Sequence, residues 1–274
     1  MGLRVNTNTL SLNAQRNLMN TTNALGRSME RLSSGLRITR ASDDAAGLAI
    51  SERFRADIRS LAQAQRNAND GISMLQIAEG ALNESSGILI RMRELAIQSA
   101  NGTLGTQEQT ILDNEFQALL TELDRIASVV EFNGNQLLDG TTATITLQVG
   151  ANNTANDQIS VAGGDATVAT LGLTGSDITD QTNSQAAIAL LDTAINTLSD
   201  QRAAFGTAQN RLESTIRSIA VAVENTSAAE SRIRDVDVAS ETAALTRNQV
   251  MQQAGVAVLA QANQTSAIAL TLLQ

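Results

Sequence analysis

The sequence predicts a mainly α-helical protein, a long helical rod or coiled-coil bundle with a small β-hairpin region at mid-chain. Over most of the 274 residues, apolar positions recur at alternating steps of three and four, a spacing that keeps one narrow seam facing a partner helix. Between residues 139 and 182 the period changes to two, which is the repeat of a β-strand. The chain has no proline and only four aromatic residues, all Phe. Its core is therefore expected to be aliphatic and helical.

The helical segments follow one another in a clear order. In the first, Leu18, Leu25 and Leu32 recur every seven residues, with Thr22, Met29 and Leu36 as a second row. Further stripes span residues 75–99, 112–130 and 188–223. An unbroken helix from about 184 to 234 would be ~75 Å long at 1.5 Å per residue. The last stripe is Ala254, Val258, Gln261, Thr265, Ile268 and Leu272.

Polar and glycine-containing stretches mark the ends of these helices. The stretch 42–44, Ser-Asp-Asp, precedes an Ala-rich run and is expected to cap a helix N-terminus. Asn101-Gly102 and Gly105 predict a short turn between antiparallel helices. Phe132-Asn133-Gly134 is expected to end the third helix, with Gly134 in the left-handed cap position. Residues 144–149 and 158–161 alternate polar and apolar side chains and predict the hairpin.

These boundaries predict five parts. An N-terminal helical segment (1–42) leads into the N-terminal half of the rod (43–138), followed by the β-hairpin tip (139–182). The C-terminal long helix of the rod (183–236) and a C-terminal helical segment (237–274) complete the chain. In this arrangement the chain runs out along helices and returns along one long helix, so both termini are expected at the same end.

Composition excludes most kinds of catalytic site. The chain has no Cys, no His and no Lys, so it offers no zinc or haem ligand, no thiol nucleophile, no Schiff base and no P-loop lysine. Asp43 and Asp44 lack the spaced ligands of a calcium loop. The sequence therefore predicts no enzyme, no cofactor and no metal site.

Charge and hydropathy limit the partners in the same way. Residues 1–40 hold six Arg and one Glu, a composition compatible with a transit peptide or with nucleic-acid binding. Without Lys or aromatic stacking residues there, we expect no nucleic-acid partner. No stretch approaches the 18 apolar residues of a membrane span, so no membrane insertion is expected. Residues 1–20 also lack the apolar core of a cleavable secretory signal.

Both terminal segments are weakly amphipathic and diluted with Asn, Gln, Ser and Thr. One interpretation is that the chain ends fray, as termini commonly do. The other is that these helices become ordered only by packing against other copies of the chain. The presence of such a segment at each end favours assembly.

Several motifs, taken in order, make the chain similar to the bacterial flagellins. The N-terminal half carries Val-Asn-Thr-Asn at 5–8, Leu-Ser-Leu-Asn-Ala-Gln at 10–15, Leu-Ser-Ser-Gly-Leu-Arg-Ile at 32–38, Ser-Asp-Asp-Ala-Ala-Gly-Leu-Ala-Ile at 42–50 and Arg-Met-Arg-Glu-Leu-Ala-Ile-Gln at 91–98. Phe-Asn-Gly at 132–134, Gln-Val-Gly-Ala at 148–151 and the leucines of 270–273 continue the match. The large variable insertion of many flagellins is missing around residues 150–180, so the chain resembles a short form without the variable outer domains.

The resemblance implies a structural role. Such a protein is secreted unfolded through the flagellar type III apparatus and polymerises into the extracellular filament that drives swimming. Its partners would be further copies of itself, an export chaperone, and the cap and hook-junction proteins. The segments 1–42 and 237–274 would form the inner tube and the 45–235 region the outer layer. The residues implied in inner-tube assembly are Leu18, Leu25, Leu32, Leu36, Val258, Ile268, Leu270, Leu272 and Leu273.

The resemblance also implies innate immune recognition by the Toll-like flagellin receptor of hosts. The matching contact residues are Arg91, Leu95 and Glu115, while Ile90 replaces the Gln commonly found before that Arg. Arg91 and Leu95 are four residues apart and are expected to share a helix face, with the seam of Leu89, Met92 and Ala96 pointing elsewhere. A solvated Arg on an exposed face is the alternative interpretation. The tail leucines 270, 272 and 273 also resemble those that a cytosolic inflammasome sensor reads.

Two other functions remain as alternatives. The hook–filament junction protein shares flagellin-like termini but usually matches less well through 91–98 and the C-terminal tail. An intracellular coiled-coil scaffold would explain the heptads, but it would have no reason to carry matching signatures at both ends.

Overall fold

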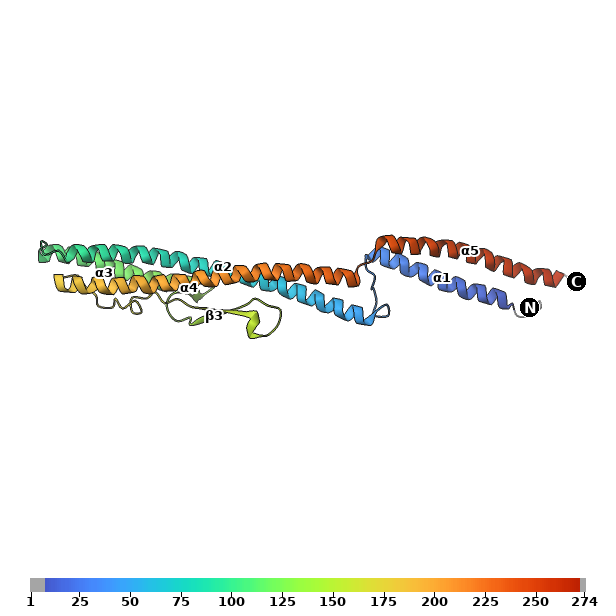
Figure 1. Cartoon of the computed structure of the whole chain (residues 1–274), viewed down its shortest axis with the longest axis horizontal. Helices are drawn as coiled ribbons and strands as arrows, with labels where there is room; N and C mark the ends of the chain where they lie inside the picture. The colour runs from blue at the N-terminus through green and yellow to red at the C-terminus, as the bar shows by residue number, and fades with distance from the viewer. Residues whose placement is uncertain (1–7, 272–274) are drawn as a thin grey trace. The chain divides into compact units, whose positions relative to one another are not determined.

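The computed structural model describes residues 8–271 of the chain, and their side chains as far as Gln264. In this range the fold is mainly α, with long helices and two small antiparallel sheets, as the periodicity predicted (Figure 1). The helices are α1 (Thr9–Ser34), α2 (Ala45–Ser99), α3 (Thr106–Val129), α4 (Gln181–Arg234) and α5 (Val238–Thr271). The strands are β1 (Glu131–Phe132), β2 (Asn135–Gln136), β3 (Thr144–Gln148) and β4 (Gln158–Ala162), with a 3-10 turn, η1 (Ala155–Asp157), before β4.

The chain divides into two compact units. The terminal unit comprises residues 1–57 and 225–274, and the central unit comprises residues 58–224. Helices α2 and α4 each contribute residues to both units. Each unit has its own packing.

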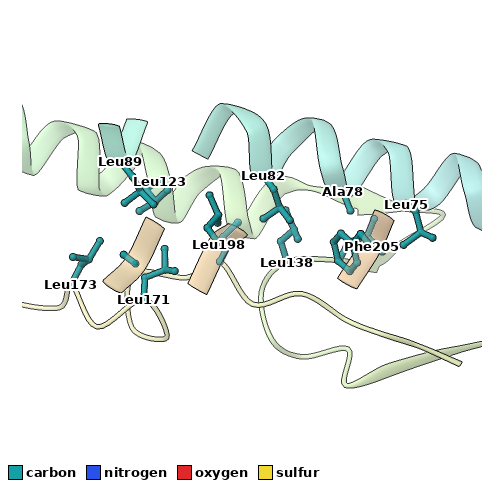
Figure 2. Packing of buried hydrophobic residues seen from close by; sticks show 14 of the residues in the cluster. Leu75, Ala78, Leu82, Leu89, Leu123, Leu138, Leu171, Leu173, Leu198 and Phe205 are labelled. Atoms are coloured by element: carbon teal, nitrogen blue, oxygen red, sulfur yellow. The ribbon is translucent and has the colours of Figure 1, made fainter. Parts of the chain in front are cut away.

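The core of the central unit follows the predicted heptads closely. On α4, a row of side chains seven residues apart is buried: Leu191, Leu198, Phe205, Leu212 and Ile219. These face a wider buried arc on α2 and a stripe on α3 that includes Leu123 (Figure 2). The irregular segments before and after the β3–β4 hairpin add Leu138, Leu171 and Leu173, which close the same cluster. The core is therefore aliphatic apart from Phe116 and Phe205.

The predicted turn between α2 and α3 is confirmed, because α2 ends at Ser99 and α3 begins at Thr106. The expectation that Phe132-Asn133-Gly134 ends the third helix is wrong. Helix α3 already ends at Val129, and Asn133 (φ 51°) and Gly134 (φ 81°) instead form the turn of the β1–β2 hairpin. A two-residue hairpin of this kind needs positive φ at both positions, which Asn-Gly supplies.

The mid-chain hairpin is also confirmed. Strands β3 and β4 pair antiparallel, from Thr144 opposite Ala162 to Gln148 opposite Gln158. Ile145 and Leu147 pack against the core of the central unit. Gly71 on α2 leaves room for this contact, because a Cβ there would clash with the Leu147 Cδ1 atom.

Three Asp-x-Thr sequences order the irregular segment around the hairpin. In each, one aspartate oxygen accepts hydrogen bonds from both the backbone N–H and the hydroxyl of the threonine two residues later; the pairs are Asp139 with Thr141, Asp165 with Thr167, and Asp177 with Thr179. These turns hold an irregular backbone in place with local side-chain hydrogen bonds. Sequence analysis did not single out this repeated motif.

We expect two of these aspartates to make the stability of the central unit depend on pH. Partial burial alone would raise the pKa of Asp165, but hydrogen bonds from Thr167 and Thr170 outweigh it and lower that pKa. Hydrogen bonds from Thr179 and Asn183 lower the pKa of Asp177. A carboxylate with a lowered folded-state pKa stabilises the fold above its unfolded pKa of about 3.9, and this stabilisation is lost as the pH falls through the folded-state pKa.

Urea unfolding at about pH 6 and about pH 2.5 should therefore show a smaller loss of stability on acidification in D165N/D177N than in the natural chain. The exposed Asp200 on α4 supplies the control variant, D200N, which should keep the natural pH dependence. Equal acid sensitivity of D165N/D177N and the natural chain would contradict this assignment.

The terminal unit is built on α1 and α5, which pack side by side (Figure 1). They run antiparallel. Arg31 near the end of α1 forms a salt bridge with Glu241 near the start of α5, and the Ser11 hydroxyl near the start of α1 donates to the Asn263 Oδ1 atom towards the end of α5. Gly35 ends α1 in the left-handed conformation (φ 72°), and its carbonyl accepts from the Val236 N–H.

The predicted cap before α2 is confirmed for one of its residues. The Asp44 Oδ1 atom accepts from the Gly47 N–H at 2.8 Å, which satisfies a free donor at the start of the helix. Asp43 has a different role, because its Oδ2 atom accepts from Thr39 and Arg40.

Candidate assembly surface and receptor-contact residues

The contact between α1 and α5 is a narrow heptad seam. Its α1 side consists of Ser11, Ala14, Leu18, Thr21, Leu25, Ser28 and Leu32, all buried or half-buried. Its α5 side consists of Glu241, Leu245, Asn248, Gln252, Gly255, Leu259 and Ala262. Steps of three and four alternate along both lists, as two helices packed along one seam require.

The seam is thin and largely polar. Leucine is its only large apolar residue, and the other positions are Ser, Thr, Ala, Gly, Asn, Gln or Glu. At Gly255 the helices approach so closely that a Cβ would lie 3.3 Å from the Leu18 Cδ1 atom. Helices in water gain most of their stability from packing an apolar face. Because its seam is mostly polar, this hairpin gains little stability from its own packing.

Large apolar side chains lie instead on the outside of the hairpin. On α1, Leu12 and Met19 are 53% and 63% exposed and stand seven residues apart, on one side of the seam. On α5, Met251 and Val258 are also seven apart and are 56% and 59% exposed. We call these two pairs the outer rows.

The outer row on α5 corrects one prediction. The stripe running through Ala254 and Val258 was expected to be the packing seam of the last helix, yet the side facing α1 is the neighbouring stripe through Gln252 and Leu259. Helix α5 thus carries two heptad stripes, and among the residues that the structure describes only the stripe through Gln252 and Leu259 faces α1.

The other predicted assembly residues fall in several places. The seam includes Leu18, Leu25 and Leu32. Leu36 is half-buried just after α1 and forms an isolated β-bridge with Asp235. Ile268 and Leu270 lie on the α5 backbone beyond the described side chains, and Leu272 and Leu273 lie outside the described residues.

The predicted receptor-contact residues are partly brought together in the central unit. The Arg91 guanidinium on α2 donates to the Glu115 carboxylate on α3 at 2.8 Å and to Glu94 at 3.1 Å. The hydrogen bonds that Arg91 donates to Glu115 and, to a smaller extent, to Glu94 raise the pKa of Arg91. Glu94 was not anticipated, although its position three residues after Arg91 is a common spacing for helical ion pairs.

The structure contradicts the expectation that Leu95 shares an exposed face with Arg91. Leu95 is 1% exposed and belongs to the core, together with Leu89 and Met92. Because α2 contacts both α3 and α4 through this core, its buried face is wider than that of a helix packed against a single partner. The residue directly before Arg91, Ile90, has an exposed apolar side chain, at 51%.

In the described part of the chain, no cluster of three or more acidic side chains is arranged to hold a metal ion. None of the helices described has a stretch apolar and long enough to cross a bilayer.

Comparisons with known proteins decide the family. A model of the bacterial flagellin N-terminal helical region matches residues 5–143, and a model of the corresponding C-terminal helical region matches residues 188–273. The chain belongs to the flagellin family. The two matched regions flank the segment where the variable outer domains were missing from the sequence, so this is a short flagellin.

Relatives of similar length support the same assignment. A flagellin of Halalkalibacterium halodurans is 50% identical over 270 residues, covering 98% of this chain and 99% of that protein. A flagellar filament 33 kDa core protein of Treponema phagedenis is 44% identical over 98% of this chain and 99% of that protein. The crystal structure of Bacillus cereus flagellin aligns with a TM-score of 0.50 at 36% identity, covering 56% of this chain and 88% of that chain. Flagellin is a component of the flagellar filament, and the long helices and outer rows belong to a filament subunit.

Proposed function

We propose that this flagellin polymerises through its terminal unit into the extracellular filament used for swimming. The observation that carries the proposal is the pair of outer rows, in which large apolar side chains stand exposed on both helices of a thinly packed hairpin. Exposed apolar rows of this kind mark surfaces that bind other proteins. We assign their occupant as further copies of the same hairpin, because the exposed heptad stripe on α5 that faces away from α1 fits another helix.

The assembly is an open polymer. An open filament requires two different, complementary surfaces on each subunit, since a self-complementary contact would close into a dimer. The two helices of the hairpin supply different surfaces, with Leu12 and Met19 on one and Met251 and Val258 on the other. Copies stacked through unlike rows can therefore add without limit.

Export as an unfolded chain through the flagellar type III apparatus fits the same composition. The chain has no Cys, so no disulfide has to be broken before passage or formed afterwards. The terminal unit would then gain its outer packing on arrival at the growing end, beneath the cap proteins. An export chaperone would cover the outer rows beforehand.

A single charge in the α5 outer row should prevent assembly. We expect V258D to raise the monomer concentration needed for polymerisation by at least about tenfold, because burying an unpaired carboxylate in an apolar contact costs more than ~1.4 kcal/mol. The monomer should keep its helicity, because Val258 is 59% exposed. Sedimentation of seeded polymerisation reactions measures this concentration.

The matched control is V221D on α4, since Val221 is 57% exposed but lies in the central unit. We expect this control to polymerise closer to the natural chain. Equal polymerisation of V258D and the natural chain would contradict the assignment of the α5 row.

We further propose that the Arg91–Glu115 pair is the centre recognised by the Toll-like flagellin receptor of hosts. The two side chains are about half exposed and form a charged pair between α2 and α3, next to the exposed Ile90. Leu95 acts from inside the core by positioning α2 rather than by direct contact. A preorganised Arg beside an apolar side chain is typical of a binding hot spot.

The variant R91A/E115A should raise the monomer concentration for half-maximal receptor signalling by about tenfold or more, as loss of a hot spot does. Its fold should be kept, because exposed ion pairs contribute little to stability. The control R125A/E122A removes another exposed ion pair, on α3, and should leave signalling unchanged. A reporter-cell assay with purified monomer measures both variants, and unchanged signalling by R91A/E115A would refute the proposed contact.

A further inference from the structure

Methionine is the main oxidation-sensitive side chain of this protein. The chain contains no Cys, Trp, Tyr or His, and it has six Met. Thioethers are oxidised by peroxides when they are accessible. The positions of the methionines therefore determine where a mild oxidant acts.

The described methionines are divided between the two units by exposure. In the terminal unit, Met19, Met29 and Met251 are 63%, 52% and 56% exposed. In the central unit, Met74 and Met92 are 6% and 0% exposed, inside the core. Met1 lies outside the described residues.

We propose that Met19, Met29 and Met251 are oxidation sites that control assembly, so that peroxide converts the free subunit into a form that cannot join the filament. The inference rests on the proposed polymerisation through the terminal unit. Two of the three residues stand in the outer rows, Met19 seven residues after Leu12 and Met251 seven before Val258. Met29 is exposed further along α1.

The chemistry needs only the oxidant. The sulfur lone pair attacks one oxygen of hydrogen peroxide, the S–O bond forms and the O–O bond breaks. The proton on the transferred oxygen passes to the departing hydroxide to give water. The sulfide is oxidised by two electrons to the sulfoxide, which is polar where the thioether was apolar.

The effect depends on the state of the subunit. In the free chain the three thioethers are accessible, and each sulfoxide places a polar group where the outer packing would have to bury it. In the filament the same side chains would be covered by neighbouring copies, so the polymer resists the oxidant that disables its monomer. Methionine sulfoxide reductase should reverse the block.

The test treats purified monomer with hydrogen peroxide, removes the peroxide, and adds short filament seeds. We expect peptide mass spectrometry to find sulfoxide at Met19, Met29 and Met251 but not at Met74 or Met92. The concentration needed for polymerisation should rise at least about tenfold, and treatment with the reductase should restore it.

For the variant M19L/M29L/M251L, the monomer concentration needed for polymerisation should be the same before and after peroxide, since Leu carries no sulfur to oxidise. The control M74L/M92L should remain as sensitive as the natural chain. A natural chain that carries sulfoxide at all three sites and still polymerises normally would overturn the inference. So would a triple variant that is blocked by peroxide as the natural chain is.

Treatment of finished filaments provides a second measurement that needs no variant. Met19, Met29 and Met251 should be protected there, and rapid oxidation of all three in intact filaments would contradict the inference. Untreated monomer is the control that distinguishes failure of the oxidation proposal from failure of the proposed polymerisation. If untreated monomer grows filaments and oxidised monomer also does, only the oxidation site is wrong; if untreated monomer does not grow, both proposals fall.

Discussion

Removing residues 250–274 should abolish polymerisation while leaving a soluble, helical monomer. The deletion takes away the whole α5 outer row, including Met251 and Val258, and the half of the seam that contacts Leu18 and Ser11. The exposed Leu12 and Met19 on α1 would remain, but without the complementary surface that an open polymer needs.

The central unit should survive this deletion, because its core lies within residues 58–224. We expect its urea-unfolding midpoint to stay within error of that of the intact chain. The helical circular-dichroism signal should fall only by the part that α1 and α5 contribute. Electron microscopy of seeded reactions measures the assembly, and a truncated chain that still forms filaments would refute the assembly model.

Replacing Phe205 by Ala should destabilise the central unit by ~3–5 kcal/mol, the usual cost of removing a buried aromatic ring. Phe205 is 4% exposed and lies in the row of α4 that faces α2. Figure 2 shows its ring beside Leu75, Ala78 and Leu138. The ring also closes over Gly164, where a Cβ would come within 3.2 Å of its Cζ atom.

The matched control is L190A, which removes an apolar side chain from the same helix at a position that is 40% exposed. It should cost less than about 1 kcal/mol, since surface substitutions rarely cost more. Urea unfolding followed by circular dichroism measures both variants. If F205A cost no more than L190A, the row on α4 would not be the core of the unit.

The periodicity of the sequence predicted the long helices well because heptads report packing directly. The buried row on α4 has the spacing of seven that was read from Leu191, Leu198 and Leu212, and the change of period to two located β3 and β4. Local patterns of this kind predict the structure well because the side chains of each stripe pack against neighbours within the same unit.

Predictions that depended on which partner a helix meets were wrong in part. Two stripes on α5 are spaced as heptads, and spacing alone does not say that the one through Leu259 meets α1 while the one through Val258 is exposed. In the same way, a position four residues from Arg91 looked exposed, but α2 packs on two sides and buries Leu95. The Asp-x-Thr turns were readable from the sequence. Arg91 and Glu115 were singled out by the resemblance and not by spacing, and the ion pair between them was not predicted.

The central claim is that the terminal hairpin completes its packing only in a polymer. The most direct test is negative-stain electron microscopy of purified protein seeded with short filament fragments, with circular dichroism before and after growth. The claim predicts long uniform filaments and a rise in helicity as the terminal helices gain their outer contacts. Protein that stays monomeric, or that adds a single layer to the seeds as a hook–filament junction protein would, with no change in helicity, would contradict it.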